Sequence, residues 1–179
     1  MSFFHETSPL RLHNVQLGTH TVSIPVAEIS VRNPGKTLLI TGGMDGDEYA
    51  GMEACYQIIK MFEHNDFAGT LIIVPIVNIP GFQSECSQNP LDGRFPKYVF
   101  PGKNNGSPTE QLIAQLQQIG LDKADAWLDL HGGALTERLF PFVWTYETGV
   151  PAVDHLTKRF QERIGGTILY ERAKIGSKA

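Results

Sequence analysis

The hydrophobic positions of this chain predict several short strands. Apolar runs at 37–41, 70–77 and 126–130 are nearly uninterrupted, as in strands that a parallel sheet buries on both faces. Apolar and polar or small residues alternate over much of 14–32, which predicts extended chain with one buried side. The chain therefore carries strand patterns of two kinds, one fully buried and one half-buried.

Helical patterns separate these strands. Apolar residues recur at helical spacing over 50–63, and helices are also expected at 109–119 and 153–164. Two further strands are expected at 140–144 and 167–170. Strands that alternate with helices predict an α/β fold, with a mainly parallel or mixed sheet and helices on both faces.

One long segment interrupts the alternation. Residues 78–108 are rich in proline, glycine and asparagine, and predict an ordered loop. A loop of this length inside a compact domain usually has a function. The chain length of 179 residues predicts a single α/β catalytic-type domain over 1–179.

Composition and charge exclude several classes of protein. The chain is 41% hydrophobic and 19% charged, as in globular proteins, and its net charge is −4. It has no basic stripe, so we expect no nucleic-acid partner. No apolar run approaches 18 residues, so we expect no membrane partner. The lone cysteines, Cys55 and Cys86, are typical of a reducing compartment, and together with the lack of a signal peptide they predict a cytoplasmic protein.

Candidate ligands for a metal ion follow two of the predicted buried strands. Asp45 and Glu48 follow the first and precede a helix, and His131 directly follows the third. Because the carboxyl ends of parallel strands meet at one edge of a sheet, we expect the three to lie close together. Two ligands near in sequence and a distant third, with one position open for water, are typical of a catalytic zinc site.

Each half of this pattern also has a simpler interpretation. The pair Asp45 and Glu48 is compatible with an acidic helix N-terminus, and a lone histidine after a strand is often structural. The occurrence of both at two strand ends favours the metal site. The alternation of side chains along the strand leaves open whether Asp129 supports His131 or points away from it.

Several motifs resemble those of the succinylglutamate desuccinylase/aspartoacylase family. They are GGMDGDEYAG at 42–51, VNIPGF at 77–82, NPLDG at 89–93, FPG at 100–102 and DLHGG at 129–133. The resemblance covers about 37–144. It implies a carboxypeptidase-like zinc hydrolase that removes acyl groups from amino-acid amines, with one Zn²⁺ held by Asp45, Glu48 and His131.

The chain also departs from the family pattern. Asp45 stands where the family has a histidine ligand, which implies a less acidic bound water and a preference relaxed toward Mn²⁺ or similar ions. Ser87 stands where the family has an arginine that grips a substrate carboxylate, and Lys97-Tyr98 replaces an Asn-Arg pair. Lys97, Tyr98 and Arg138 are therefore our predicted substrate-binding residues.

The resemblance implies a catalytic glutamate on a strand well after the DLHGG motif. We expect the chain to lack the C-terminal part of the family, to bind metal and to hydrolyse poorly. The rival expectation is that Glu171 serves as the catalytic base.

The predicted function is metal-dependent hydrolysis of an amide bond in a small-molecule N-acyl amino acid or peptide-like substrate. A carboxypeptidase-like metallopeptidase and a non-catalytic metal- or ligand-binding relic of the family are the alternatives. Oligomerisation is left open.

Overall fold

The computed structural model describes residues 9–30, 35–62, 67–164 and 166–172. The chain divides into two compact units, 1–138 and 139–179, each with its own sheet, and the single catalytic-type domain stays a prediction. In the described part of the chain, no helix has the length and apolar character needed to cross a membrane.

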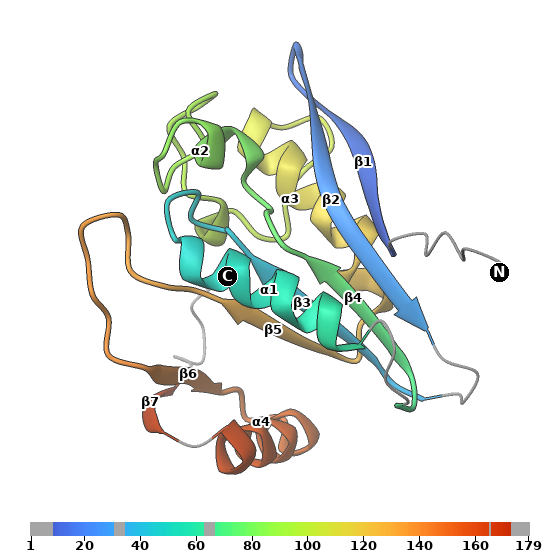
Figure 1. The fold of residues 1–179 in the computed structure, drawn as a ribbon, viewed down its shortest axis with the longest axis vertical. Helices are drawn as coiled ribbons and strands as arrows, with labels where there is room; N and C mark the ends of the chain where they lie inside the picture. The colour runs from blue at the N-terminus through green and yellow to red at the C-terminus, as the bar shows by residue number, and fades with distance from the viewer. Residues whose placement is uncertain (1–8, 31–34, 63–66, 165, 173–179) are drawn as a thin grey trace, which may run out of the picture. The chain divides into compact units, whose positions relative to one another are not determined.

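The first unit is built on a five-stranded mixed sheet. Its strands are β1 (Leu10–Leu17), β2 (His20–Ser30), β3 (Thr37–Gly42), β4 (Thr70–Val74) and β5 (Ala126–Leu130). They lie in the order β1-β2-β4-β3-β5 (Figure 1). β3 runs parallel to β4 and β5, whereas β2 is antiparallel to β1 and β4. The stretch expected to be extended chain is an antiparallel hairpin that turns at Gly18, whose φ is 62°.

Helices cover both faces of this sheet, as predicted. α1 (Tyr49–Phe62) packs on one face and α3 (Pro108–Ile119) on the other (Figure 1). Neighbouring residues of one strand face opposite sides, so each face has its own core. On the α1 face the buried core includes Ala27, Ile29, Ile40, Cys55, Ile59, Leu71 and Ile73. On the α3 face it includes Leu39, Met44, Ile72, Val74, Leu112, Ile113 and Leu116.

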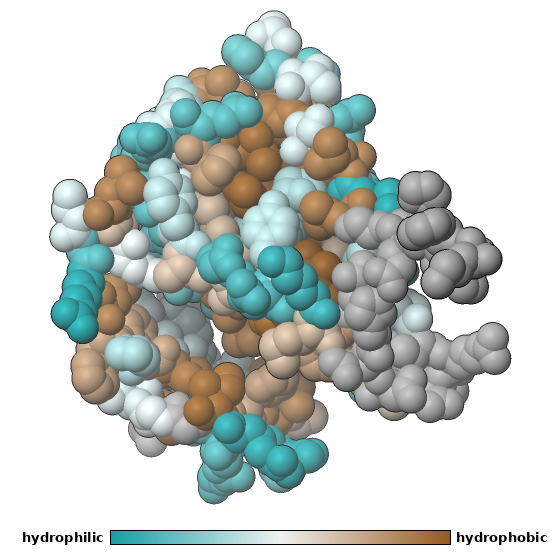
Figure 2. Space-filling view, viewed as in Figure 1, coloured by the Kyte–Doolittle hydropathy of each residue, from teal (hydrophilic) through white to brown (hydrophobic). Residues whose placement is uncertain are grey.

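Polar side chains cover the side of α1 that faces solvent. Glu53, Gln57 and Lys60 are exposed there, and Figure 2 shows hydrophilic surface over this helix. The apolar residues Met52, Cys55 and Ile59 point to the sheet. This division of polar and apolar positions is the pattern that predicted the helix.

The long segment between β4 and α3 is ordered by short elements and buried polar groups. It contains α2 (Ile79–Gln83) and the 3₁₀ helix η1 (Pro96–Tyr98), and a second 3₁₀ helix, η2 (Leu121–Lys123), follows α3. The fully buried Asn78 accepts a hydrogen bond from the Gly81 amide (3.1 Å) and donates to the Ser87 carbonyl (3.1 Å). This side chain therefore holds both sides of the loop together.

The second unit consists of β6 (Phe142–Glu147), α4 (Pro151–Ile164) and β7 (Thr167–Arg172). β6 and β7 pair in parallel, and the helix connects them. The predicted strands at 140–144 and 167–170 and the predicted helix at 153–164 correspond to these elements. Glu171 lies in β7, but its side chain is outside the described part of the structure.

Candidate metal centre

The loop after β3 places Asp45 and Glu48 at the start of α1. Gly43 adopts a φ of 60°, in the left-handed region that favours glycine. A Cβ atom on Gly46 would lie 2.2 Å from the Gly81 carbonyl carbon, so only glycine lets this loop pack against α2. The Glu48 amide donates to the Asp45 carbonyl at 3.3 Å. This turn directs both carboxylates toward the edge of the sheet.

The end of β5 places His131 opposite these carboxylates. β5 pairs in parallel with β3, and Thr41 lies opposite Asp129 in that pairing. A Cβ on Gly51 would lie 2.1 Å from the Leu130 carbonyl oxygen, so α1 and the end of β5 are in direct contact. The Glu48 carboxylate accepts a hydrogen bond at 3.0 Å from the amide of Gly132, which lies just after β5.

The three predicted ligands lie together. Asp45, Glu48 and His131 each offer one ligand atom, and these atoms lie within 4.8 Å of one another. His131 Nδ1 is 2.8 Å from Glu48 Oε2 and 3.5 Å from Asp45 Oδ2. Two atoms that bind one ion at about 2.0–2.2 Å lie no more than about 4.4 Å apart, and both pairs meet that limit.

Two more charged residues complete this group. Asp129 Oδ2 lies 2.8 Å from His131 Nε2, and Lys97 Nζ lies 2.5 Å from Asp45 Oδ2. We define Asp45, Glu48, Lys97, Asp129 and His131 as the charged cluster. Its members come from the loop after β3, from η1 and from the end of β5.

Asp129 supports His131, which settles the question that the sequence left open. Residues two apart on a strand face the same side, so the alternation in fact directs Asp129 toward His131. Its other oxygen accepts a 2.6 Å hydrogen bond from the Thr41 hydroxyl, which in turn accepts one from the indole N–H of Trp127 at 2.8 Å. The sequence reasoning missed Thr41 and its role, although its position at the end of a central strand was a usable signal.

The surroundings of the charged cluster shift the pKa values of its members. Hydrogen bonds to Asp129, Asp45 and Glu48 raise the pKa of His131 to about 12, although burial opposes this. Burial raises the pKa of Asp45, but hydrogen bonds from His131 and Lys97 outweigh it, so the pKa of this carboxyl lies below its usual value. The Asp45 carboxylate, in turn, raises the pKa of Lys97 against the effect of burial.

The residues of the charged cluster fit a divalent cation. Asp45 is only 1% exposed, and its Oδ1 atom is buried with no hydrogen-bond partner. A buried carboxylate oxygen without a partner is unfavourable unless a cation binds it. With His131 neutral, as a metal ligand must be, three carboxylates and one ammonium leave two negative charges. A divalent ion balances that charge.

The predicted substrate-binding residues lie in different surroundings. Lys97 belongs to the charged cluster, whereas Tyr98 is 77% exposed, and the Nζ atom of Lys97 lies 5.6 Å from its ring. Arg138 is exposed in the loop after β5 and has no ion pair within the described part of the chain. Ser87 donates a 2.7 Å hydrogen bond to Asp47, which holds the loop that carries Asp45.

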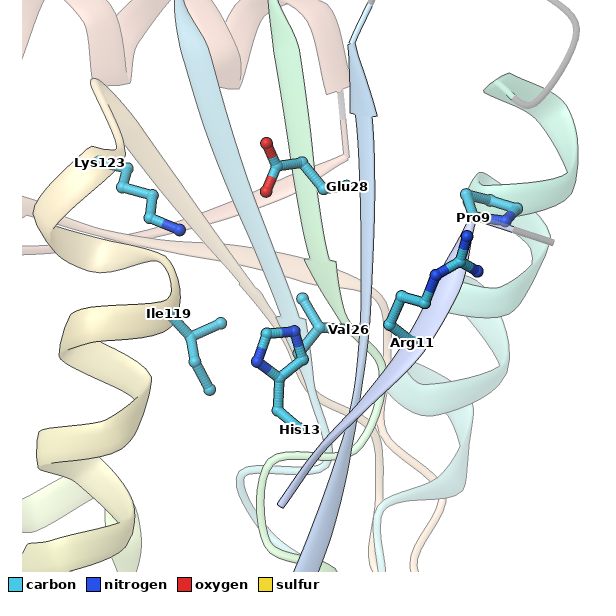
Figure 3. Close-up of a pocket in the computed structure, with 7 residues that line it drawn as sticks. All are labelled: Pro9, Arg11, His13, Val26, Glu28, Ile119 and Lys123. Carbon is cyan, nitrogen blue, oxygen red and sulfur yellow. The ribbon is translucent and has the colours of Figure 1, made fainter. Parts of the chain in front are cut away.

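A separate hollow lies between β1, β2 and the end of α3. It is lined by Pro9, Arg11, His13, Val26, Glu28, Ile119 and Lys123 (Figure 3). Its charged side chains are of both signs, and it includes no member of the charged cluster.

Comparisons with known proteins agree with this geometry. A model of the succinylglutamate desuccinylase/aspartoacylase catalytic domain matches residues 34–156. An N-alpha-acetyl-L-2,4-diaminobutyric acid deacetylase from Halomonas elongata is 34% identical over 138 residues, which cover 77% of this chain and 40% of the relative.

Solved structures have the same fold. A succinylglutamate desuccinylase/aspartoacylase from Rhodobacter sphaeroides is 26% identical, with a TM-score of 0.75, over 89% of this chain and 51% of that one. A metallo-carboxypeptidase from Pseudomonas aeruginosa is 16% identical, with a TM-score of 0.67, over 95% of this chain and 49% of that one. The predicted carboxypeptidase-like α/β fold is confirmed. The chain spans about half or less of the length of these relatives.

Proposed function

This chain belongs to the succinylglutamate desuccinylase/aspartoacylase family, and we propose that it is a metal-dependent hydrolase that removes the acyl group from an N-acyl amino acid or a related small molecule. The similar deacetylase from Halomonas elongata supports an amide substrate of this kind.

One observation carries the proposal. Asp45, Glu48 and His131 come from two strand ends and bring their ligand atoms within 4.8 Å of one another, and the Oδ1 atom of Asp45 is buried without a hydrogen-bond partner. A histidine and two carboxylates are ligands that Zn²⁺ accepts, and the oxygen-rich set also suits Mn²⁺. We propose one such ion, held by these three residues.

The chain's own residues prepare the site for this chemistry. When bound, a divalent ion supplies Lewis acidity to the amide carbonyl and activates water. Asp129 holds the His131 ring by its Nε2 atom, so that Nδ1 faces Asp45 and Glu48. We propose Lys97, Tyr98 and Arg138 as contacts of the substrate.

The proton acceptor of the reaction stays a prediction. A general base must reach the attacking water, and our leading expectation is that this chain hydrolyses poorly. The rival proposal is that Glu171 serves as the base. Replacement of Glu171 by glutamine separates the two, since a base is needed for turnover but not for metal binding.

Metal content and turnover together test the proposal. The 179-residue chain is loaded with Zn²⁺ or Mn²⁺, its metal content is measured, and hydrolysis of a panel of N-acetyl and N-succinyl amino acids is followed. We expect about one ion per chain and slow release of the free amino acid. Glu48→Gln should abolish both, whereas Glu53→Gln, an exposed position on α1, should change neither.

Other outcomes identify the alternatives. Hydrolysis of peptides with a free C-terminus, but not of N-acyl amino acids, would indicate a carboxypeptidase-like metallopeptidase. Bound metal without turnover of either class would indicate a non-catalytic relic. A wild-type chain that binds no divalent ion would contradict the proposal. Both cysteines are free thiols, which supports our proposal of a cytoplasmic location.

A further inference from the structure

Lys97 contacts the most deeply buried carboxylate of the charged cluster. Its ammonium nitrogen lies 2.5 Å from Asp45 Oδ2, and the side chains of Lys97 and Asp45 are 32% and 1% exposed. The rings of Phe95 and Tyr98 lie 5.4 Å and 5.6 Å from the same nitrogen, at distances where aromatic faces attract a cation. Lys97 is therefore held by an ion pair and by contacts with two aromatic rings.

The oxygen that Lys97 contacts also faces the candidate metal site. Asp45 Oδ2 lies 2.5 Å from the Lys97 ammonium and 3.5 Å from His131 Nδ1, so one oxygen is near both the lysine and another candidate ligand. A divalent ion bound by Asp45, Glu48 and His131 would therefore meet the positive charge of Lys97 across a single carboxylate. In a partly buried site this repulsion is screened much less than at the surface.

We propose that Lys97 is a built-in competitor of the metal ion for Asp45. The proposal rests on the metal site of the proposed function. Without an ion, the ammonium neutralises the buried carboxylate. When an ion binds, it shares Asp45 with Lys97 or displaces the ammonium from Oδ2, and either event weakens binding. Lys97 thus lowers the affinity of the site for divalent cations.

The same contact bears on substrate recognition. An ammonium displaced from Asp45 stays beside the site and is available to pair with a carboxylate of an N-acyl amino acid. Lys97 would then form an ion pair with Asp45 in the metal-free protein and with the substrate carboxylate in the metal-bound protein.

Metal affinity of charge-removing variants tests the proposal. Lys97→Met removes the charge and keeps an unbranched side chain, and Lys97→Gln also keeps a hydrogen-bond donor for Asp45. The matched control is Lys103→Met, whose side chain is 75% exposed and lies 3.5 Å from Glu110, outside the charged cluster. Each metal-free 179-residue chain is titrated with Zn²⁺ and Mn²⁺ in competition with a chromophoric chelator, at fixed pH.

We expect both Lys97 variants to bind the ions at least about tenfold more tightly than wild type, and Lys103→Met to stay within about twofold. Binding by the Lys97 variants but not by wild type would support the competition and contradict the proposed function, since wild type would then bind no ion. Equal or weaker binding by folded Lys97→Met and Lys97→Gln would overturn it while leaving the metal site intact. No binding by wild type or any variant would overturn the metal site and this proposal together.

Discussion

At the scale of single residues, the contact between Asp129 and His131 determines how the histidine ring is oriented in the charged cluster. Asp129 contacts the Nε2 atom of His131, the nitrogen that faces away from Asp45 and Glu48. A carboxylate on the far nitrogen of a histidine ligand fixes the ring and makes the near nitrogen a stronger donor. Thr41 holds the second oxygen of Asp129, so the ring is anchored to β3.

Asp129→Asn tests this role. The amide keeps the shape of the side chain but loses the charge, and it can no longer hold His131 as a carboxylate does. We expect affinity for Zn²⁺ to fall about 10- to 100-fold, with the circular dichroism spectrum unchanged. Asp122→Asn, at an exposed position in η2, is the control and should bind as wild type does. Unchanged affinity in Asp129→Asn would show that the contact has no part in metal binding.

Among the elements, α3 is tied to the long loop by charge as well as by packing. Ser107 and Glu110 form a capping box at its start. Asp92 accepts hydrogen bonds from the Thr109 amide (2.9 Å) and from its hydroxyl group. Burial raises the pKa of Asp92, but hydrogen bonds from Ser107, Thr109 and the Arg94 amide outweigh it, so this pKa lies below the usual aspartate value.

The sign of this shift gives a prediction for acid stability. The folded protein prefers ionised Asp92, so the contribution is fully present above the unfolded pKa of about 3.9 and is lost as pH falls through the lower folded pKa. At pH 7 we expect Asp92→Asn to lower the free energy of unfolding by about 1 kcal/mol. The gap between wild type and variant, measured by urea denaturation, should close toward pH 3. A gap that stays constant from pH 7 to pH 3 would contradict the role assigned to the charge.

For the whole molecule, the candidate metal site connects segments that lie far apart in sequence. Asp45 and Glu48 precede α1, Lys97 lies in η1 and His131 follows β5. An ion that binds the folded chain but not the unfolded chain stabilises the fold by mass action.

Thermal unfolding measures this coupling. At an ion concentration about 100 times the dissociation constant, the gain is about 2.7 kcal/mol, and each kcal/mol raises the Tm of a chain of this size by about 2–4 °C. We therefore expect added Zn²⁺ to raise the Tm by several degrees and a chelator to reverse the rise. Glu48→Gln should unfold at the same temperature with and without the ion. An equal rise in Glu48→Gln would place the binding elsewhere.

Local sequence determined the main helices and strands and the edge of the sheet at which the candidate metal ligands lie. The apolar runs that form β3, β4 and β5 and the helical spacing in α1 and α3 each depend on residues close together in the chain, so periodicity reveals them. The rule that parallel strands present their carboxyl ends at one edge then predicts that Asp45, Glu48 and His131 lie together. The hairpin turn at Gly18 was missed, because a glycine between two alternating stretches has no periodicity of its own.

Only the tertiary structure decided which groups surround the ligands. Lys97 meets Asp45 across 52 residues of sequence, Ser87 reaches Asp47 across 40, and Thr41 reaches Asp129 across 88. The register of β3 against β5 determines the last contact, and the path of the loop between β4 and α3 determines the first two. Neither register nor loop path leaves a local pattern in the sequence, because both depend on packing between distant segments. The sequence therefore identified the three candidate metal ligands, and the fold placed a lysine beside one of them.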